Sequence, residues 1–483
     1  MHFLKTYQAW IIVLVAVLSR VPQLLSPLLL LDGDECIVGL MAKHLYEGKE
    51  LPLYLYGQSY GFSLVEVLAI YPFYCLIGIS GISVKLGMLC LWILGVVFFN
   101  NTLRNLQSDN PWLPPLFILV LVFAPSWAVC SMKAWGFYLT AFCLSSLTLY
   151  LITSTFLKPL HWIFVAVLVV LIYESQPLWL PGLYPFLMYY LLRERSWRPF
   201  LLFVIGSSVT LSILFLLKRN LTSVWPPPTF TFNENMVERA FSIPRLIYGN
   251  MTGSYYYSVL IDMGLATDFW AACFTGFIFL GLTAGLLFLI RKKEYPLLYV
   301  SCMAVMFNLG YLGLISSHSP RYLLPLTGYA LIMFFELLKV VKNNYASAVF
   351  CGVLVIPGAI SLIQFKDHRS ELQDRSQLQQ VLDYLAANDV RYVFCRQPLL
   401  DCQINFYSQE QIVARHETVH RYPEYCSRVN AAYRSHQPCA VIDSFDRRGF
   451  RESPNKHLIA NTYLVHLNPT REELIEYGFD LGE

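Results

Sequence analysis

The sequence contains few charged residues for its length. Only 14% of its 483 residues are Asp, Glu, Lys or Arg, and 56% are hydrophobic. Soluble domains carry roughly a quarter charged residues, so this chain lacks the polar surface that water would solvate. The composition excludes an ordinary soluble protein and predicts several segments buried in lipid.

A long run of basic residues is also missing. The formal net charge is only +3, so we expect no nucleic-acid partner. Lys and Arg instead form short clusters between apolar runs, which is typical of cytoplasmic loops in membrane proteins. The three clearest clusters are Arg193 to Arg198, Arg291 to Lys293 and Lys339 to Lys342.

A signal-peptide cleavage site is absent after the first apolar run, Trp10 to Leu31. The run also exceeds the about 7–15 apolar residues of a signal-peptide core. We therefore interpret it as a retained helix with a cytoplasmic N-terminus.

The apolar runs together predict about 11 transmembrane helices. Alternation of the spans places the loop 218–269, the turn 316–322 and everything after residue 365 on the outer face. The spans after the first lie near residues 84–101, 113–131, 136–153, 160–175, 178–192, 199–217, 270–290, 296–315, 321–338 and 346–364.

The apolar stretch Ser63 to Ile79 has no crossing available to it. The first helix runs outward, and the span 84–101 must return inward to reach Arg104. Glu66 within the stretch and the segment "ELPLYLYGQSYG" before it favour interfacial helices over a span. We predict an outer-face loop at residues 32–83, with helices that lie on the membrane.

The composition becomes polar after Ile363. Leucines at helical spacing follow, and "RYVFC" (391–395) and "CAVIDSF" (439–445) have the pattern of short buried strands. The predicted fold is an all-α polytopic membrane domain, residues 1–365, followed by a small extracytoplasmic α/β domain, residues 366–483. Cysteines of the tail can form disulfides outside the membrane, with a pairing that the sequence leaves open: Cys395, Cys402, Cys426 and Cys439.

Three carboxylates follow the first predicted helix: Asp32, Asp34 and Glu35. Their crowding at a membrane boundary should raise their pKa values, which suits a general base or a cation site. The alternative is a polar end to the helix with no chemical role.

The segment "DGDECIVGLMAKHLYEGKELPLYLYGQSYGFSLVEVL" resembles the first outer loop of the GT-C membrane glycosyltransferases, especially the bacterial protein O-mannosyltransferase-like group. "SPRYLLPL" (319–326) resembles a late outer turn of the same group. The tail sequences "INFYSQEQIVAR" and "RYPEY" are similar to the tails of its prokaryotic members.

This resemblance implies an inverting glycosyltransferase of a prokaryotic cell membrane. Such a hexosyl or pentosyl transferase moves a sugar from a polyprenyl-phosphate carrier to an acceptor hydroxyl on a protein, lipid or glycan at the outer face. Asp34 would be the general base, and Glu35 would orient it or bind the acceptor. No metal ligand and no cofactor is required, although Asp32, Asp34 and Glu35 can together hold a divalent metal.

The leaving phosphate needs positive charge. Arg321 at an outer helix mouth can contact a phosphate with two nitrogens, and His318 and Tyr322 beside it can donate hydrogen bonds. Lys133 in the outer turn "CSMKAWGF" is a second candidate cation. The alternative for both cations is an interfacial side chain that extends toward water.

One feature departs from the family. Many relatives carry a second acidic residue in the outer turn after the third span, and "SMKAWGFYLT" contains none. Glu66 and Glu174 are possible substitutes. We assign Asp32 and Glu66 to the substrate-binding set, and the departure leaves the acceptor type open.

Two other classes of function are alternatives to a glycosyltransferase. A lipid or sugar transporter or flippase would explain the spans, but should show internal repeats and broken helices at mid-membrane. A membrane-tethered metalloprotease is suggested only by "HETVH", His416 to His420. On a helix this motif would place two zinc ligands on one face, but Pro423 leaves little room for a helix.

Overall fold

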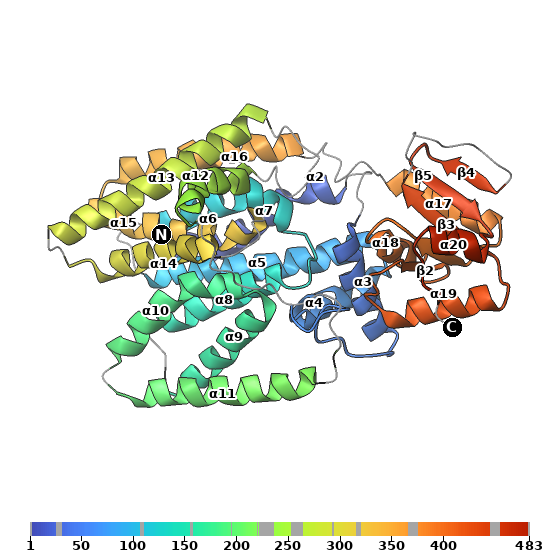
Figure 1. Cartoon of the computed structure of the whole chain (residues 1–483). Helices are drawn as coiled ribbons and strands as arrows, with labels where there is room; N and C mark the ends of the chain where they lie inside the picture. The colour runs from blue at the N-terminus through green and yellow to red at the C-terminus, as the bar shows by residue number, and fades with distance from the viewer. Residues whose placement is uncertain are drawn as a thin grey trace.

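The computed structural model has a bundle of helices with a smaller α/β domain packed against one end (Figure 1). This arrangement confirms the predicted fold class. The structure describes residues 2–25, 31–106, 111–154, 158–194, 196–219, 221, 236–252, 264–291, 294–314, 320–365, 375–444 and 455–481.

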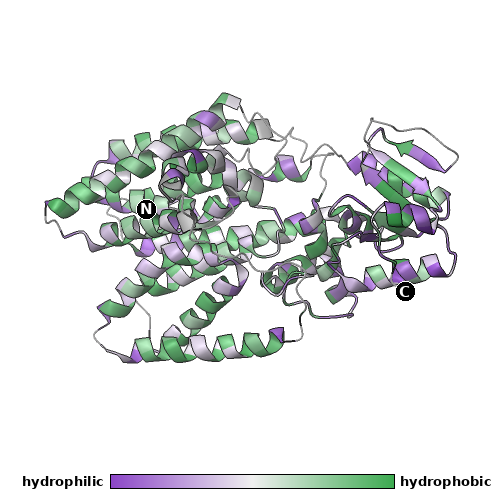
Figure 2. Cartoon of the chain, in the orientation of Figure 1, coloured by the Kyte–Doolittle hydropathy of each residue, from purple (hydrophilic) through white to green (hydrophobic). Residues whose placement is uncertain are grey.

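The bundle contains a helix at each predicted span. Among the described residues, five helices are long and apolar enough to cross a membrane: α5, α11, α13, α15 and α16. Apolar residues cover most of the bundle, and polar residues gather in the C-terminal domain and at helix ends (Figure 2). The helices are α1 (His2–Leu18), α2 (Val21–Leu24), α3 (Gly33–Tyr46), α4 (Leu64–Ile77), α5 (Gly81–Asn105), α6 (Leu113–Phe123), α7 (Pro125–Cys130), α8 (Tyr138–Thr153), α9 (His161–Ser175), η1 (Pro177–Trp179), α10 (Leu180–Arg193), α11 (Arg198–Lys218), α12 (Met236–Thr252), α13 (Gly264–Ile290), α14 (Pro296–Leu314), η3 (Pro320–Leu323), α15 (Leu324–Val341) and α16 (Asn344–Phe365).

The first span differs from its predicted bounds. Its helix, α1, ends at Leu18, so Arg20 lies outside the regular helix. The span predicted at 113–131 is also divided, because Pro125 has no N–H to continue α6 and begins α7 instead.

The segment 32–83 contains two helices, α3 and α4, and the first residues of α5. Both of its ends contact the C-terminal domain. Gln403 donates a hydrogen bond to the Leu31 carbonyl at 2.9 Å, and Gln409 donates one to the Ile79 carbonyl at 3.4 Å. The segment therefore leaves and re-enters the bundle at the same end, without crossing it.

The C-terminal domain is a five-stranded sheet in the order β2-β1-β3-β5-β4. Strand β1 is parallel to β2 and β3, and the remaining pairs are antiparallel. The strands predicted at 391–395 and 439–445 correspond to β1 and β3. The elements are α17 (Arg375–Ala387), β1 (Tyr392–Cys395), α18 (Leu400–Tyr407), β2 (Val413–His416), α19 (Pro423–Arg434), β3 (Cys439–Ser444), β4 (Lys456–Ile459), β5 (Tyr463–Leu467) and α20 (Arg471–Glu476).

The cysteines of the tail form no disulfide. Cys395, Cys402 and Cys439 are buried as thiols, and Cys426 is half-buried.

Helix α3 packs closely against α18 of the C-terminal domain. A side chain added at Gly33 would place its Cβ 2.1 Å from Cβ of Leu399, and one at Gly39 would meet the Phe406 ring at 2.5 Å. These two positions accept only glycine without rearrangement, so the docking of the two domains is built into the first outer loop.

Candidate active site

The three predicted carboxylates lie at the N-terminus of α3. Asp32 is the N-cap residue, and its side chain accepts from the Glu35 N–H at 2.9 Å. The Glu35 carboxylate accepts from the Asp32 N–H at 3.1 Å, which completes a capping box. The side chain of Asp34, which lies between them in the sequence, is not part of this capping box.

Two buried lysines form ion pairs with Asp32 and Glu35, the carboxylates on either side of Asp34. Lys133 contacts Asp32 at 2.8 Å and Glu35 at 3.2 Å, and Lys85 of α5 forms an ion pair with Glu35. Trp135 also donates to Asp32 at 3.1 Å. Two acids and two bases thus neutralise one another, and they anchor α3 to α5 and to the turn before α8.

Asp34 lines a cavity of about 730 Å³ at the end of the bundle that meets the C-terminal domain. The lining contains acidic, basic and aromatic side chains, and Asp34 is the residue that α3 contributes. They include Asp34, Tyr60, Trp135, Tyr138, Glu174, Gln176, Lys218, Arg219, Tyr311, Arg321, Tyr322 and Arg421.

The pKa values of Asp32 and Asp34 move in opposite directions. Burial by itself raises the pKa of Asp32, but the charge and hydrogen bond of Lys133 lower it to about 2. Burial and the neighbouring Asp32 raise the pKa of Asp34, and Arg421 and Arg321 oppose this rise. Of these two carboxylates, Asp34 has the higher pKa and is therefore the stronger base, and it is also the one that faces the cavity.

Arg321 enters the cavity at the start of the helical turn η3. Aromatic rings surround its guanidinium, with centroids 5.5 Å away for Trp135, 5.6 Å for Tyr138 and 5.9 Å for Tyr322. The rings hold the charge in place and keep it accessible to the cavity. His318 lies outside the described residues.

Glu174, at the end of α9, also lines the cavity, whereas Glu66 does not. Glu174 forms an ion pair with Lys218 and accepts from the Tyr54 hydroxyl at 3.4 Å. Glu66 is buried and accepts from the Gly136 N–H at 2.8 Å. Of the two substitutes considered for the missing second acid, Glu174 is the one that shares a cavity with Asp34.

The structure thus brings Asp34, Arg321 and Tyr322 together. Asp32, Glu35 and Lys133 lie behind the cavity wall in the buried ion-pair network, and their substrate-binding or catalytic roles remain predictions, as does that of Glu66.

Sequence reasoning did not single out Arg421, Lys218 or Arg219 as cavity residues. The first lies in "RYPEY", a segment noted for its resemblance but not for its arginine. Lys218 and Arg219 directly follow the span predicted near residues 199–217 and begin the loop 218–269.

An apolar cavity of about 480 Å³ adjoins the first and shares Tyr173, Pro177 and Tyr311 with it. Its remaining lining comes from α10 and α14, including Leu180, Met306 and Phe307. The cavity that contains Asp34 therefore continues into an open apolar groove between α10 and α14.

The "HETVH" segment does not form a zinc site. His416 ends strand β2, and its ring nitrogen accepts from the backbone N–H groups of Thr418 and Val419 at 3.2 and 3.1 Å. The two histidines therefore do not share a helix face. Within the described part of the chain, no group of three or more His, Cys, Asp or Glu side chains is arranged to hold a metal ion.

Comparison with solved structures finds similar folds. ArnT from Cupriavidus metallidurans in the apo state aligns with a TM-score of 0.62 and 13% identity, over 96% of this chain and 98% of that chain. ArnT from the same organism bound to undecaprenyl phosphate aligns with a TM-score of 0.61 and 12% identity, over 96% and 98%. No protein-family model and no curated protein sequence matches the chain.

Proposed function

Because the chain has the GT-C glycosyltransferase fold, we propose that it is an inverting glycosyltransferase that uses a polyprenyl-phosphate-linked sugar. The observation that carries the proposal is Asp34, a carboxylate of raised pKa that faces a large cavity containing Arg321. A base and a phosphate-binding cation in one chamber are the two groups that this chemistry requires.

The proposed reaction needs no covalent intermediate. Asp34 accepts the proton of an acceptor hydroxyl, whose oxygen attacks C1 of the sugar. The bond between C1 and the phosphate oxygen breaks, and its electron pair leaves with the polyprenyl phosphate. Attack from the side opposite the phosphate inverts the anomeric centre.

Arg321 suits the leaving group. Its guanidinium can donate two parallel hydrogen bonds to phosphate oxygens, and Tyr322 beside it can supply another. Aromatic rings around the cation exclude water, which strengthens its interaction with the charge that develops on the phosphate.

The adjoining apolar cavity fits the lipid part of such a donor. One of the similar ArnT structures contains undecaprenyl phosphate. In this chain, the shared wall of Tyr173, Pro177 and Tyr311 would mark the passage from the phosphate to the first isoprene units.

We further propose that Glu174 substitutes for the missing second acid by binding the acceptor. The acceptor is a protein, lipid or glycan at the extracytoplasmic face of a prokaryotic cell membrane. In this orientation the N-terminus is cytoplasmic, and the C-terminal domain is outside.

The test uses membranes that contain the chain, a panel of radiolabelled polyprenyl-phosphate sugars, and the variant Asp34→Asn. We expect sugar transfer or hydrolysis by the wild type, and a loss of about 10²–10⁴-fold in the variant. Asp383→Asn is the matched control, because this carboxylate is exposed on α17. Activity unchanged in Asp34→Asn would remove Asp34 as the base. No turnover of any donor would contradict the enzyme class and favour a transporter.

A further inference from the structure

We propose that Arg421 is a positioning residue for Asp34: the C-terminal domain inserts this guanidinium into the cavity, where its charge orients the carboxylate and keeps it ionised. The inference rests on the proposed function. It adds a residue from the opposite end of the chain to the catalytic machinery.

The first observation is the ion pair itself. A guanidinium nitrogen of Arg421 lies 3.6 Å from Oδ1 of Asp34, and both side chains line the same cavity. The Arg421 side chain is only 11% exposed and that of Asp34 is 28% exposed. Limited exposure weakens solvent screening, so the pair interacts more strongly than two surface charges.

The backbone at Arg421 is held in place by the first outer loop. Gly57 adopts a φ of +73°, and a Cβ at this position would lie 3.1 Å from Cα of Arg421. Only glycine combines that conformation with that approach at no cost. The "YGQ" turn thus fits against the arginine's own main chain.

The residue after Arg421 is fixed by aromatic packing. The ring of Tyr422 lies 4.9 Å from that of Tyr56 and 5.0 Å from that of His44, measured between centroids. Tyr56 belongs to the first outer loop and His44 to α3, the same helix that carries Asp34. Asp34 and Arg421 are therefore positioned by a common set of contacts.

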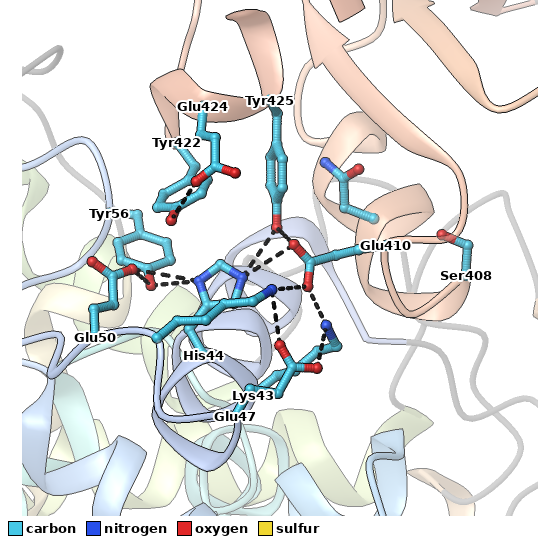
Figure 3. A network of polar contacts seen from close by, with 12 residues as sticks. Lys43, His44, Glu47, Glu50, Tyr56, Ser408, Glu410, Tyr422, Glu424 and Tyr425 are labelled. Atoms are coloured by element: carbon cyan, nitrogen blue, oxygen red, sulfur yellow. Dashed lines mark hydrogen bonds and ion pairs between the residues drawn. The ribbon is translucent and has the colours of Figure 1, made fainter. Parts of the chain in front are cut away.

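An ion-pair cluster closes the same interface (Figure 3). Glu410 of the C-terminal domain pairs with Lys43, contacts Lys49 at 3.2 Å and His44 at 3.2 Å, and accepts from the Tyr425 hydroxyl at 2.9 Å. This cluster lies at the far end of α3 from Asp34. The domain is thus fixed at two points along the helix, which limits how far Arg421 can move.

The environment of Asp34 explains why a cation is needed there. Asp32 and Glu35 on its own helix end disfavour its ionised form, and burial adds to the effect. Arg321 opposes them but is surrounded by rings and is assigned to the phosphate. Arg421 is then the cation that offsets the negative charge of Asp34 during turnover. The titratable and charged groups that interact with the charge of Asp34 are Asp32, Glu35, Tyr60, Tyr138, Arg321, Cys402 and Arg421.

The test compares Arg421→Gln and Arg421→Lys with Arg428→Gln, a control arginine on α19 that does not line the cavity. Two readouts are followed against pH: kcat/KM, and carbodiimide labelling of Asp34 measured by peptide mass spectrometry. In Arg421→Gln we expect the acid limb of kcat/KM and the midpoint of labelling to move up by about one pH unit, since loss of a nearby opposite charge raises a carboxyl pKa. Arg421→Lys should restore most of the shift, and Arg428→Gln should show none.

Three outcomes would overturn the inference. They are an unmoved labelling midpoint in Arg421→Gln, a loss of activity that is equal at every pH, and a lysine variant no better than the glutamine variant. Because labelling needs no turnover, it decides the role of Arg421 even where the wild type transfers no sugar. A wild type that transfers no sugar would contradict the proposed function instead.

Gly57→Ala provides a variant that leaves every charge in place. Its Cβ should displace Arg421, so we expect a shift in the same direction as Arg421→Gln. An unshifted profile in a folded Gly57→Ala would contradict the positioning argument.

Discussion

At the scale of single residues, three neighbouring carboxylates have three different surroundings. Asp32 and Glu35 are tied to lysines, whereas Asp34 faces the cavity and the two arginines. Ion pairs therefore occupy the carboxylates of Asp32 and Glu35, whereas the carboxylate of Asp34 stays open to the cavity. Their spacing in the sequence is too short to reveal this division.

The buried pair Glu35–Lys85 gives a stability prediction. Lys85→Met should lower the free energy of unfolding by about 3–5 kcal/mol, because it leaves a buried carboxylate short of a partner. Thermal unfolding of the purified protein in detergent measures the effect. The double variant Glu35→Gln, Lys85→Met should cost less than the sum of the single variants, and strict additivity would show that the two groups do not interact.

The pH dependence of transfer gives a second prediction. Asp34 must be ionised to accept a proton, and its pKa is raised. Activity should therefore fall as the pH decreases through a value above the usual aspartate pKa of about 3.9. The residual activity of Asp34→Asn should show no acid limb in its pH profile of kcat/KM. An acid limb identical to that of the wild type would assign the titration to another group.

How much of this site the sequence predicts depends on the range of the contacts. Asp34 and Arg321 each lie in a local motif at a helix end, where residue type and position already indicate chemistry. Lys133 was predicted from the same kind of position, but its partners Asp32 and Glu35 are about a hundred residues earlier in the chain. Arg421 was missed because only the docking of the C-terminal domain brings it to Asp34.

At the scale of elements, Arg20 stabilises the break between α6 and α7. It donates to the carbonyls of Val122 at 2.9 Å and Trp127 at 3.3 Å, and to the Ser131 hydroxyl at 2.7 Å. Its guanidinium also lies 4.6 Å from the centroid of the Trp92 ring. Arg20 thus supplies a donor to the Val122 carbonyl at the end of α6, whereas the Trp127 carbonyl also accepts from the Ser131 N–H at 2.9 Å.

Arg20→Met should destabilise the bundle by roughly 1–3 kcal/mol, because the Val122 carbonyl loses its arginine donor. The expected result is a lower melting temperature in detergent. Arg193→Met, at an exposed helix end, should change it little. Equal stability of the two variants would show that the break is satisfied by other groups.

Long apolar runs predict the spans well, because a membrane helix needs about 20 apolar residues and no tertiary information. The division at Pro125 and the end of α1 at Leu18 were not predicted. Arg20 stabilises the division at Pro125 through hydrogen-bond partners that lie more than a hundred residues away in the chain. The interfacial placement of α3 and α4, which was inferred from the alternation of the spans, stays a prediction.

At the scale of the whole molecule, we expect the docking of the two domains to depend on pH. Burial lowers the pKa of His44, but hydrogen bonds to Glu410 and Glu50 raise it above its usual value overall. Burial raises the pKa of Glu410, but His44 and Lys43 lower it overall. A raised pKa stabilises the folded state below the unfolded value, and a lowered pKa stabilises it above the unfolded value.

Docking should therefore be strongest between about pH 4.5 and 6.5, the ordinary pKa values of glutamate and histidine. It weakens as the pH falls below this window and as it rises through the pKa of His44. Hydrogen exchange of residues 400–407 across the pH range measures the effect. His44→Gln should abolish the weakening at high pH, and an unchanged profile would show that His44 does not contribute.

A second docking prediction concerns Gly39. Gly39→Leu should cost about 1–3 kcal/mol by overpacking against Phe406, and it should increase hydrogen exchange in both α3 and α18. Gly276→Leu is the control, because an added Cβ there meets nothing within 4 Å. Protection of α3 and α18 equal to the wild type would contradict the close packing.

The pairing of Asp34 with Arg421 also has a consequence for biosynthesis. Nearly the whole chain separates these residues, and at about 5–20 residues per second the ribosome makes the second one about 20–80 s after the first. A nascent chain thus carries its base throughout synthesis without the cation that balances it. Chains truncated before the tail would insert into the membrane but remain inactive, so the cell would form a working centre only from completed molecules.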